Sequence, residues 1–262
     1  MIKPNVSVLM TVYNGMPFLK EAVESILCQT FENFQFVIID DCSSDDSFKY
    51  LSQLNDSRIL LKRNITNIGQ VASLNKGIDL CGGEYIARLD QDDVNMPKRL
   101  EEQLNFFNSN KDVSLICSYE YSINENGNII NKWTKDIENY GQFLGEIILG
   151  QCPVWHPSVM YKKKIVNKLG KYDVKFGPSE DYDLWSKFAF NRYNADIVKN
   201  FHLKQRLHGK RQSITNLDKQ LESVNKIHLK NLSLIMNGDF SIDLSKFLLL
   251  EKNDNKKKYI NK

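Results

Sequence analysis

Short apolar runs alternate with helical segments along the first part of the sequence. The four runs lie at residues 6–12, 34–39, 58–61 and 84–89. The segments between them carry apolar residues at helical spacing, as in Phe18, Ala22 and Ile26. Nearly continuous apolar runs are typical of parallel strands that helices cover on both faces. The alternation therefore predicts an α/β fold built on a mostly parallel, doubly wound sheet.

Acidic residues follow two of these predicted strands. Asp40 and Asp41 end the second strand, and Asp90, Asp92 and Asp93 follow the fourth. Ligands of open α/β sheets bind beyond the carboxyl ends of the strands, which is where these carboxylates are expected. Carboxylates so close raise one another's pKa unless a cation lies among them, and a divalent metal is one such cation. An isolated Asp-x-Asp is more often a solvated turn with a helix cap, so the rest of the sequence has to decide.

The regular alternation ends after Asp93. The elements expected from there on are a helix from Met96, a strand at 113–121, a hairpin turn at Asn126-Gly127, a strand at 154–160, a helix after Asp181, a strand at 195–203 and an amphipathic helix from Leu217. This half is therefore expected to be less regular than the first.

Composition and charge exclude several classes of function. The 262 residues are 42% hydrophobic and 26% charged, as in ordinary soluble globular proteins. A net charge of +3, with dispersed basic residues, does not indicate nucleic-acid binding. No run approaches the roughly 18 apolar residues of a membrane span, and residues 1–4 do not resemble a signal peptide. The five cysteines include no Cys-x-x-Cys, which predicts free thiols and a cytoplasmic location.

Six short motifs follow one another along the chain. They are Ser7-Val8-Leu9-Met10-Thr11-Val12-Tyr13-Asn14-Gly15, Ile38-Ile39-Asp40-Asp41, Asn67-Ile68-Gly69, Leu89-Asp90-Gln91-Asp92-Asp93, His156-Pro157-Ser158 and Glu180-Asp181. Their order resembles the family 2 inverting glycosyltransferases, over about residues 5–215. The resemblance implies the nucleotide-sugar-binding fold called GT-A. It also implies metal-dependent transfer of a sugar from a nucleotide-diphospho-sugar to a hydroxyl acceptor, with inversion at the anomeric carbon.

The resemblance gives roles to residues around the donor. It places Thr11, Val12 and Tyr13 at the uracil and ribose of a UDP-sugar, where the tyrosine ring can stack on the base. A tyrosine at the edge of the core is the alternative. Asp41 would accept a hydrogen bond from the uracil N–H, whereas Asp40 fits a cap or an arginine partner equally well. Further donor contacts are expected at Asn67, Asp90, Gln91 and Arg206.

The same resemblance assigns a metal site and a general base. Asp92 would bind Mn²⁺ or Mg²⁺ at the diphosphate, and Asp90 would hold the ribose or a metal-bound water. Arg206 and His208 lie where the family has a late loop that closes over the diphosphate, and His208 is a candidate metal ligand. Asp181 matches the base that takes the proton from the acceptor hydroxyl. Without the resemblance, an acid that caps a helix would be the simpler interpretation.

Trp155, Trp185 and Asp93 each have two interpretations at this point. Trp155 and Trp185 fit either stacking on the acceptor or packing in the core. His156 is expected only to order its strand. Asp93 is either part of the acidic site or a cap for the following helix.

The resemblance also divides the chain. Residues 1–112 would be the nucleotide-sugar-binding half and 113–214 the acceptor-binding half of one GT-A domain, followed by a C-terminal helix and basic tail at 215–262. The expected acceptor is a saccharide or lipid-linked saccharide, in surface polysaccharide assembly at the inner membrane face. The tail at Lys256-Lys257-Lys258 fits peripheral membrane contact, at about 1 kcal/mol per lysine, or a solvated end.

Two departures from the family pattern bear on these expectations. Cys42 stands where the family often has glycine, which leaves the turn after Asp41 uncertain. The Gln-x-x-Arg-Trp signature of processive polysaccharide synthases does not occur, so addition of a single sugar is expected.

Two other functions fit part of the pattern. Asp90-Gln91-Asp92-Asp93-Val94 also matches the nucleophile motif of haloacid-dehalogenase-type phosphatases, in which Asp90 would form a phosphoenzyme. That motif normally follows the first strand, whereas three predicted strands precede it here. A noncatalytic nucleotide-binding module is the second alternative, and Asp181 beside an intact Asp-x-Asp argues against it.

Overall fold

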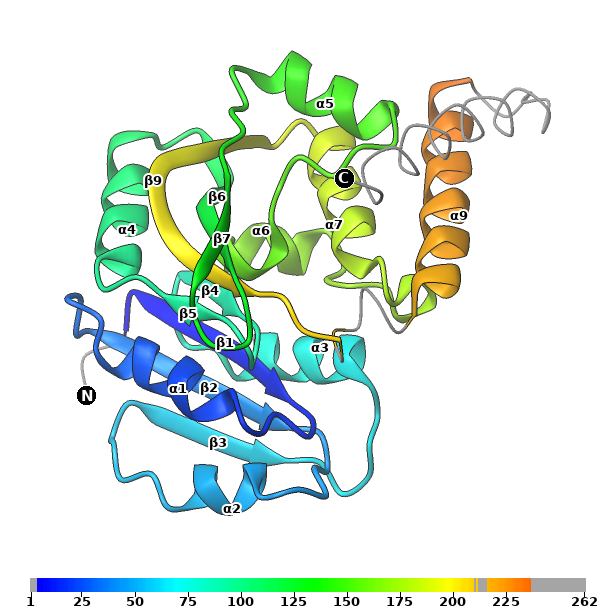
Figure 1. Cartoon of the computed structure of the whole chain (residues 1–262). Helices are drawn as coiled ribbons and strands as arrows, with labels where there is room; N and C mark the ends of the chain where they lie inside the picture. The colour runs from blue at the N-terminus through cyan, green and yellow to red at the C-terminus, as the bar shows by residue number, and fades with distance from the viewer. Residues whose placement is uncertain (1–3, 210, 212–215, 237–262) are drawn as a thin grey trace.

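The computed structural model describes residues 4–209, 211 and 216–236, and its elements are labelled in Figure 1. In chain order they are β1 (Val6–Val12), α1 (Leu19–Leu27), β2 (Phe34–Asp40), α2 (Ser47–Ser52), β3 (Ile59–Arg63), α3 (Gln70–Leu80), β4 (Tyr85–Leu89), β5 (Val94–Asn95), α4 (Arg99–Ser109), β6 (Val113–Ile123), β7 (Ile129–Trp133), α5 (Tyr140–Ile148), η1 (His156–Ser158), β8 (Met160–Lys162), α6 (Lys163–Lys168), η2 (Val174–Phe176), α7 (Glu180–Phe190), β9 (Asn194–Arg206) and α9 (Leu217–Ile235).

The described strands form one nine-stranded sheet. Its order is β3-β2-β1-β4-β8-β6-β9-β5, and β7 pairs with β6. The first four strands run parallel, with Val6 of β1 opposite Phe34 of β2 and Tyr85 of β4. Their carboxyl ends therefore meet at one edge of the sheet. The predicted α/β fold with a mostly parallel sheet is confirmed.

Strand β9 joins the second half of the sheet to this edge. It runs parallel to β6 over most of its length, and its end pairs antiparallel with β5, where Lys204 lies opposite Val94. Because β5 directly follows the acidic loop, β9 carries the residues after Arg206 toward Asp92. Figure 1 shows this long strand curving around the second half of the molecule.

Helices cover both faces of the sheet, as the alternation of apolar residues requires. Leu9 and Val37 lie on one face, in a buried cluster with residues of α3, α5 and α7. Val8 and Met10 lie on the other face, in a cluster with residues of α1 and α4. Successive residues of β1 thus point to opposite cores, which explains why the strand is apolar throughout. The sheet is doubly wound, as predicted.

The strand predicted at 154–160 is wrong for most of its length. His156–Ser158 forms a 3₁₀ turn, and the strand is confined to Met160–Lys162, which pairs antiparallel with β4 and β6. Pro157 has no N–H for a sheet and a fixed φ, so the chain turns there although its neighbours are apolar. The hairpin is as predicted, with Gly127 at a φ of 82° between β6 and β7.

All five cysteines are free thiols, as expected. None of the described helices is long and apolar enough to cross a membrane.

Candidate active site

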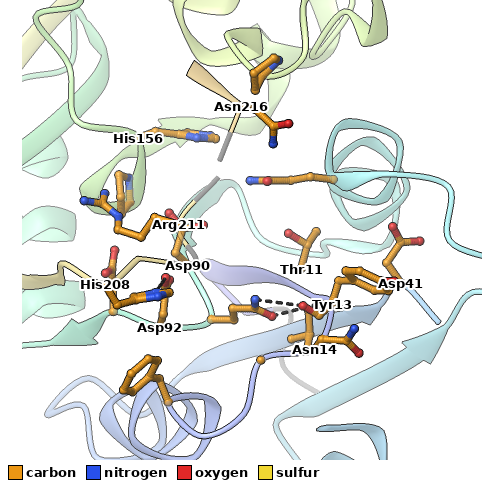
Figure 2. A pocket seen from close by; sticks show the side chains of 18 of the residues that line it. Thr11, Tyr13, Asn14, Asp41, Asp90, Asp92, His156, His208, Arg211 and Asn216 are labelled. Atoms are coloured by element: carbon orange, nitrogen blue, oxygen red, sulfur yellow. Dashed lines mark hydrogen bonds and ion pairs between the residues drawn. The ribbon is translucent and has the colours of Figure 1, made fainter. Parts of the chain in front are cut away.

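The carboxyl ends of β1, β2 and β4 border a cavity of about 830 Å³ (Figure 2). The first turns of α7 and α9 border the same cavity. Its lining contains every site residue predicted from the sequence except Arg206, namely Thr11, Val12, Tyr13, Asp41, Asn67, Asp90, Gln91, Asp92, Asp181 and His208. The fold thus brings these residues together from positions up to 197 apart in the sequence.

Gln91 holds the loop that follows β1. Its amide oxygen accepts from the backbone N–H of Tyr13 at 2.9 Å, and its amide nitrogen donates to the Tyr13 carbonyl at 3.2 Å. Tyr13 is 48% exposed, so its ring is not packed in the core. Gln91 therefore positions the backbone of Tyr13, and the tyrosine ring borders open space.

Asp41 is buried beneath a turn of the backbone. Its carboxylate accepts from Asn64 Nδ2 at 2.8 Å and from the backbone N–H groups of Ile68 at 2.9 Å and Gly69 at 2.8 Å. Gly69 has a φ of 87°, a conformation that residues with a Cβ rarely adopt. Asn67 Oδ1 accepts from the same Gly69 N–H at 3.1 Å. The motif Asn67-Ile68-Gly69 therefore fixes the orientation of Asp41.

Asp40 has a different partner from its neighbour. Its Oδ2 lies 3.2 Å from Arg63 Nε and accepts from the Ser43 backbone N–H at 3.2 Å. Asp40 therefore has an arginine partner, Arg63, which was one of the two interpretations left open. Cys42, which follows Asp41, has a φ of 65°, the left-handed conformation that glycine adopts at lower cost. The turn thus keeps the backbone that a glycine would favour, although cysteine occupies the position.

A buried arginine lies beneath the acidic loop. Arg88 of β4 is 0% exposed, and its guanidinium pairs with the Asp90 carboxylate. Part of the positive charge that the carboxylates need therefore comes from the protein itself, which the sequence interpretation missed. A charged residue inside an otherwise apolar buried strand was the available signal.

Asp92 and His208 lie side by side in the cavity lining, and Figure 2 marks the contact between them. Asp92 Oδ2 lies 2.7 Å from His208 Nε2. Burial and the neighbouring Asp90 raise the pKa of Asp92, and His208 opposes this shift. Carboxylate and imidazole are both suitable ligands for Mn²⁺.

Within the part of the chain that the structure describes, no group of three or more His, Cys, Asp and Glu residues could hold a metal ion by itself. Metal ions at nucleotide sites commonly take one or two protein ligands and several phosphate oxygens. Asp92 and His208 therefore fit a metal whose remaining ligands come from a diphosphate.

Arg206 has a structural role that differs from the predicted one. It is 1% exposed and does not line the cavity. Its Nε donates to the Asp92 carbonyl at 3.1 Å, and its Nη1 donates to the carbonyls of Asn124 at 3.2 Å and Glu125 at 3.0 Å. Its Nη2 pairs with Glu21 of α1. These contacts direct the guanidinium away from the cavity, so Arg206 positions the acidic loop and we leave it out of the donor contacts.

Asp93 supports this arrangement and is not a helix cap. Its Oδ1 accepts from the Arg206 backbone N–H at 2.8 Å. The cap interpretation fails because helix α4 begins only at Arg99, and Asp93 instead ties the acidic loop to the end of β9.

Glu180 and Asp181 form the first turn of α7 and both line the cavity. Asp181 Oδ1 accepts from the Tyr182 N–H at 2.8 Å, and burial raises the pKa of Asp181. Burial and the adjacent Asp181 raise the pKa of Glu180 to about 7. Arg88 opposes both shifts. A carboxylate with a raised pKa at the wall of a cavity is suited to accept a proton near neutral pH.

Other cavity residues were not expected from the sequence. Arg211, Asn216 and Gln220 come from the segment after β9, and Arg211 and Asn216 are labelled in Figure 2. His156 also lines the cavity, and its Nε2 lies 2.8 Å from the Tyr172 hydroxyl. Arg211, Asn216 and Gln220 belong to no short motif, so only the fold could bring them to the site, whereas His156 belongs to the motif His156-Pro157-Ser158.

The two tryptophans under consideration do not line the cavity. Trp185 is fully buried, so it packs in the core and does not stack on an acceptor. Trp155 contacts Trp133 of β7, with ring centroids 5.9 Å apart.

Glu120 of β6 provides a test of burial near the site. It is 0% exposed, neither carboxylate oxygen has a hydrogen-bond partner among the described residues, and burial raises its pKa from 4.5 to about 7. Because the pKa is raised in the folded state, the contribution of Glu120 to the free energy of unfolding is greatest below about pH 4.5. This contribution is lost as the pH rises through about 7. Glu120→Gln should therefore raise the melting temperature at pH 8.5, by the equivalent of about 3 kcal/mol at about 1.36 kcal/mol per pKa unit.

The difference in melting temperature between Glu120→Gln and wild type should shrink toward pH 5, where the buried carboxyl group of Glu120 is already neutral. Thermal unfolding of wild type and Glu120→Gln across this range measures it, with the exposed Glu138→Gln as control. A gain that does not depend on pH would contradict the assignment of a buried carboxylate.

The chain is similar to known proteins in sequence and in fold. The family model described as glycosyl transferase family 2 matches residues 7–170. An uncharacterized glycosyltransferase of Methanocaldococcus jannaschii is 38% identical over 224 residues, which cover 84% of this chain and 77% of that protein.

Solved structures share the fold at low sequence identity. TarS 1–349 of Staphylococcus aureus in complex with UDP-GlcNAc has a TM-score of 0.70 and 17% identity, covering 94% of this chain and 71% of that one. The mannosyltransferase PcManGT of Pyrobaculum calidifontis, in complex with GDP-Man and Mn²⁺, has a TM-score of 0.65 and 15% identity. The match covers 96% of this chain and 70% of that one.

The match extends over more than half of the chain and includes the strands that carry the acidic loop. It argues against both alternative functions, the haloacid-dehalogenase-type phosphatase and the noncatalytic nucleotide-binding module. Asp90 follows the fourth strand, where a phosphatase nucleophile would follow the first. The relatives are enzymes, which argues against a noncatalytic module. The chain is therefore a glycosyltransferase and belongs to glycosyl transferase family 2.

Proposed function

We propose that the protein transfers a single sugar from a UDP-sugar to a hydroxyl acceptor, with a divalent metal and with inversion at the anomeric carbon. One observation supports this most directly. A single cavity contains the Asp92–His208 pair, the exposed Tyr13 ring and the raised-pKa carboxylate Asp181. Nucleotide, metal and base thus have places in one continuous space.

The nucleotide would lie against the ends of β1 and β2. The ring of Tyr13 would stack on the base, with Thr11 and the backbone of Val12 beside the ribose. Asp41 would accept from the uracil N–H, since its backbone donors fix its position and each carboxylate oxygen can accept more than one hydrogen bond. Asn67 would complete this part of the site, and Asp90 would face the ribose.

The diphosphate would lie at Asp92 and His208, which would hold Mn²⁺ or Mg²⁺. When bound, the metal stabilises the charge that develops on the departing nucleoside diphosphate. Arg211 lines the same cavity and opposes the rise in the pKa of Asp92 and Asp93, so its charge reaches this end of the cavity. It takes the place among the diphosphate contacts that the sequence suggested for Arg206.

Asp181 would act as the general base. Its carboxylate would take the proton from the acceptor hydroxyl as that oxygen attacks the anomeric carbon. Attack and departure on opposite faces of the sugar would invert the configuration. The guanidinium of the buried Arg88 pairs with Asp90, and its positive charge would favour the ionised form of Asp181, because it opposes the rise in the pKa of Asp181 that burial causes.

We further propose that the acceptor is a saccharide or lipid-linked saccharide of a surface polysaccharide. The basic tail at residues 256–258 lies outside the described residues, so membrane contact through it remains a proposal from the sequence alone.

The choice of nucleotide is the direct test of this proposal. At equal concentration and with Mn²⁺, UDP should raise the melting temperature more than GDP, ADP or CMP, because Asp41 accepts from the uracil N–H. A ligand at about 100 times its Kd adds about 2.7 kcal/mol of stability. A thermal-shift series with the four nucleotides measures the order. Equal stabilisation by all four would contradict the uracil assignment, and a larger effect of GDP would reassign the base.

A phosphatase assay tests the alternative use of Asp90. We expect no hydrolysis of p-nitrophenyl phosphate, because Asp90 is paired with Arg88 and follows the wrong strand for a phosphoenzyme. Hydrolysis that disappears in Asp90→Asn would reverse this conclusion.

A further inference from the structure

The end of the cavity formed by α7 and α9 lies beyond the residues that the family model matches. Glu180 and Asp181 come from the first turn of α7, and Asn216 and Gln220 come from the start of α9. The matched residues end at 170. Glu180-Asp181 is one of the six motifs, whereas Asn216 and Gln220 belong to none of them, so the motifs do not determine the α9 side of this end.

Hydrogen bonds hold the start of α9 against α7. Ser179 Oγ donates to the Gln220 carbonyl at 3.2 Å, and Ser223 Oγ donates to the Phe176 carbonyl at 2.7 Å. About two turns after Ser223, Lys230 Nζ lies 2.7 Å from the buried Asp183 carboxylate. Gln220 is thereby fixed beside the helix turn that carries Glu180 and Asp181.

Glu180 presents an unused hydrogen-bonding atom at this end. The residue is 5% exposed and lines the cavity, and its Oε2 has no hydrogen-bond partner among the described residues. A buried carboxyl oxygen without a partner costs free energy, which a bound ligand with a hydroxyl or amide group would recover.

Arg211 is the only arginine or lysine among the described residues that line the cavity. Its charge opposes the rise in the pKa of Asp92, Asp93 and Glu120, so it acts near the acidic loop, where His208 contacts Asp92. His156 is uncharged at neutral pH, because burial and the nearby Arg88 hold its pKa well below the usual value. The α7–α9 end instead offers carboxylates and amides. Such a surface repels a phosphate and matches hydroxyl groups, which both donate and accept.

We propose that the α7–α9 end binds an uncharged saccharide as acceptor, and that Gln220 and Glu180 select it through hydrogen bonds to its hydroxyl groups. Acceptors that carry a phosphate next to the reacting hydroxyl are disfavoured. This inference rests on the proposed function and specifies the class of acceptor for the same site. Gln220 is a specificity-determining residue, because its amide can donate to one hydroxyl and accept from another.

The test uses the full chain with Mn²⁺ and four donors, UDP-glucose, UDP-galactose, UDP-GlcNAc and UDP-GalNAc. The acceptor panel pairs octyl glycosides of glucose, galactose, mannose and N-acetylglucosamine with glycerol phosphate and ribitol phosphate. Release of UDP is measured with and without acceptor. We expect at least one octyl glycoside, and neither phosphate, to accelerate UDP release and to yield a disaccharide product.

Variants of α9 then test the residue. Gln220→Ala should raise KM for the glycoside about tenfold, the effect of one lost hydrogen bond to an uncharged group, with KM for the donor unchanged. Glu222→Gln, an exposed change on the same helix, should match wild type.

Three results would overturn the inference. They are no response to any octyl glycoside, a phosphate acceptor used better than every glycoside, or an unchanged glycoside KM in Gln220→Ala. The proposed function would survive each of them if UDP binds with Mn²⁺ and the donor is still hydrolysed slowly by water. Loss of both donor activities would contradict the proposed function itself.

Discussion

Replacing Asp181 by asparagine should lower the transfer rate by about 10²–10⁴-fold, the usual range for a lost general base. Asparagine keeps the shape of the side chain and can still accept from the Tyr182 N–H. It cannot take up the acceptor proton. Since Asp181 lies on the helix α7 side of the cavity, UDP binding with Mn²⁺ should not change.

Titration calorimetry with UDP and Mn²⁺, beside a transfer assay, separates these two effects. Asp218→Asn, an exposed acid on the first turn of α9, is the matched control and should behave like wild type. Near-normal transfer by Asp181→Asn, or loss of its nucleotide binding, would remove Asp181 as the base. Glu180 would then take the role, because Asp183 is fully buried and paired with Lys187 and Lys230.

Replacing Asp92 by alanine should abolish the effect of Mn²⁺ on UDP binding and reduce transfer at least as strongly as Asp181→Asn does. Asp92 is proposed to hold the metal in the ground state and in the transition state, so both binding and turnover depend on it. Loss of the carboxylate also removes the partner of His208 at 2.7 Å. The two variants should therefore differ in nucleotide affinity although both are slow.

The measurement is the affinity for UDP with and without Mn²⁺ in wild type, Asp92→Ala and Asp46→Ala. Asp46 is an exposed acid outside the cavity, so its removal should leave the metal effect intact. Retention of a Mn²⁺-dependent affinity in Asp92→Ala would mean that other residues hold the metal.

Much of the fold followed from local patterns in the sequence. The strands that carry Val6 and Phe34 are buried on both faces, so their apolar runs identify them without knowledge of their partners. The segment at 154–160 shows where this reasoning fails, because apolar neighbours hide the turn that Pro157 imposes.

The site was predictable to the extent that its residues sit in short motifs. Asp41, Asp92 and Asp181 end or begin regular elements, and the sheet edge brings them together. Arg206 and Arg211 show the limit of that reasoning. They are five residues apart in one segment, and only tertiary contacts decide that Arg206 turns inward while Arg211 lines the cavity.

The contacts of Arg206 have a consequence for how this protein can change over evolution. Its guanidinium joins α1 through Glu21, the acidic loop through the Asp92 carbonyl and the hairpin tip through the carbonyls of Asn124 and Glu125. A substitution there would remove a donor from the carbonyls of Asp92 and Glu125 and the partner of Glu21 at once. Position 206 is therefore expected to covary with position 21 and with the hairpin tip. A sequence that loses the arginine should also have a different hairpin tip and a different first turn of α1.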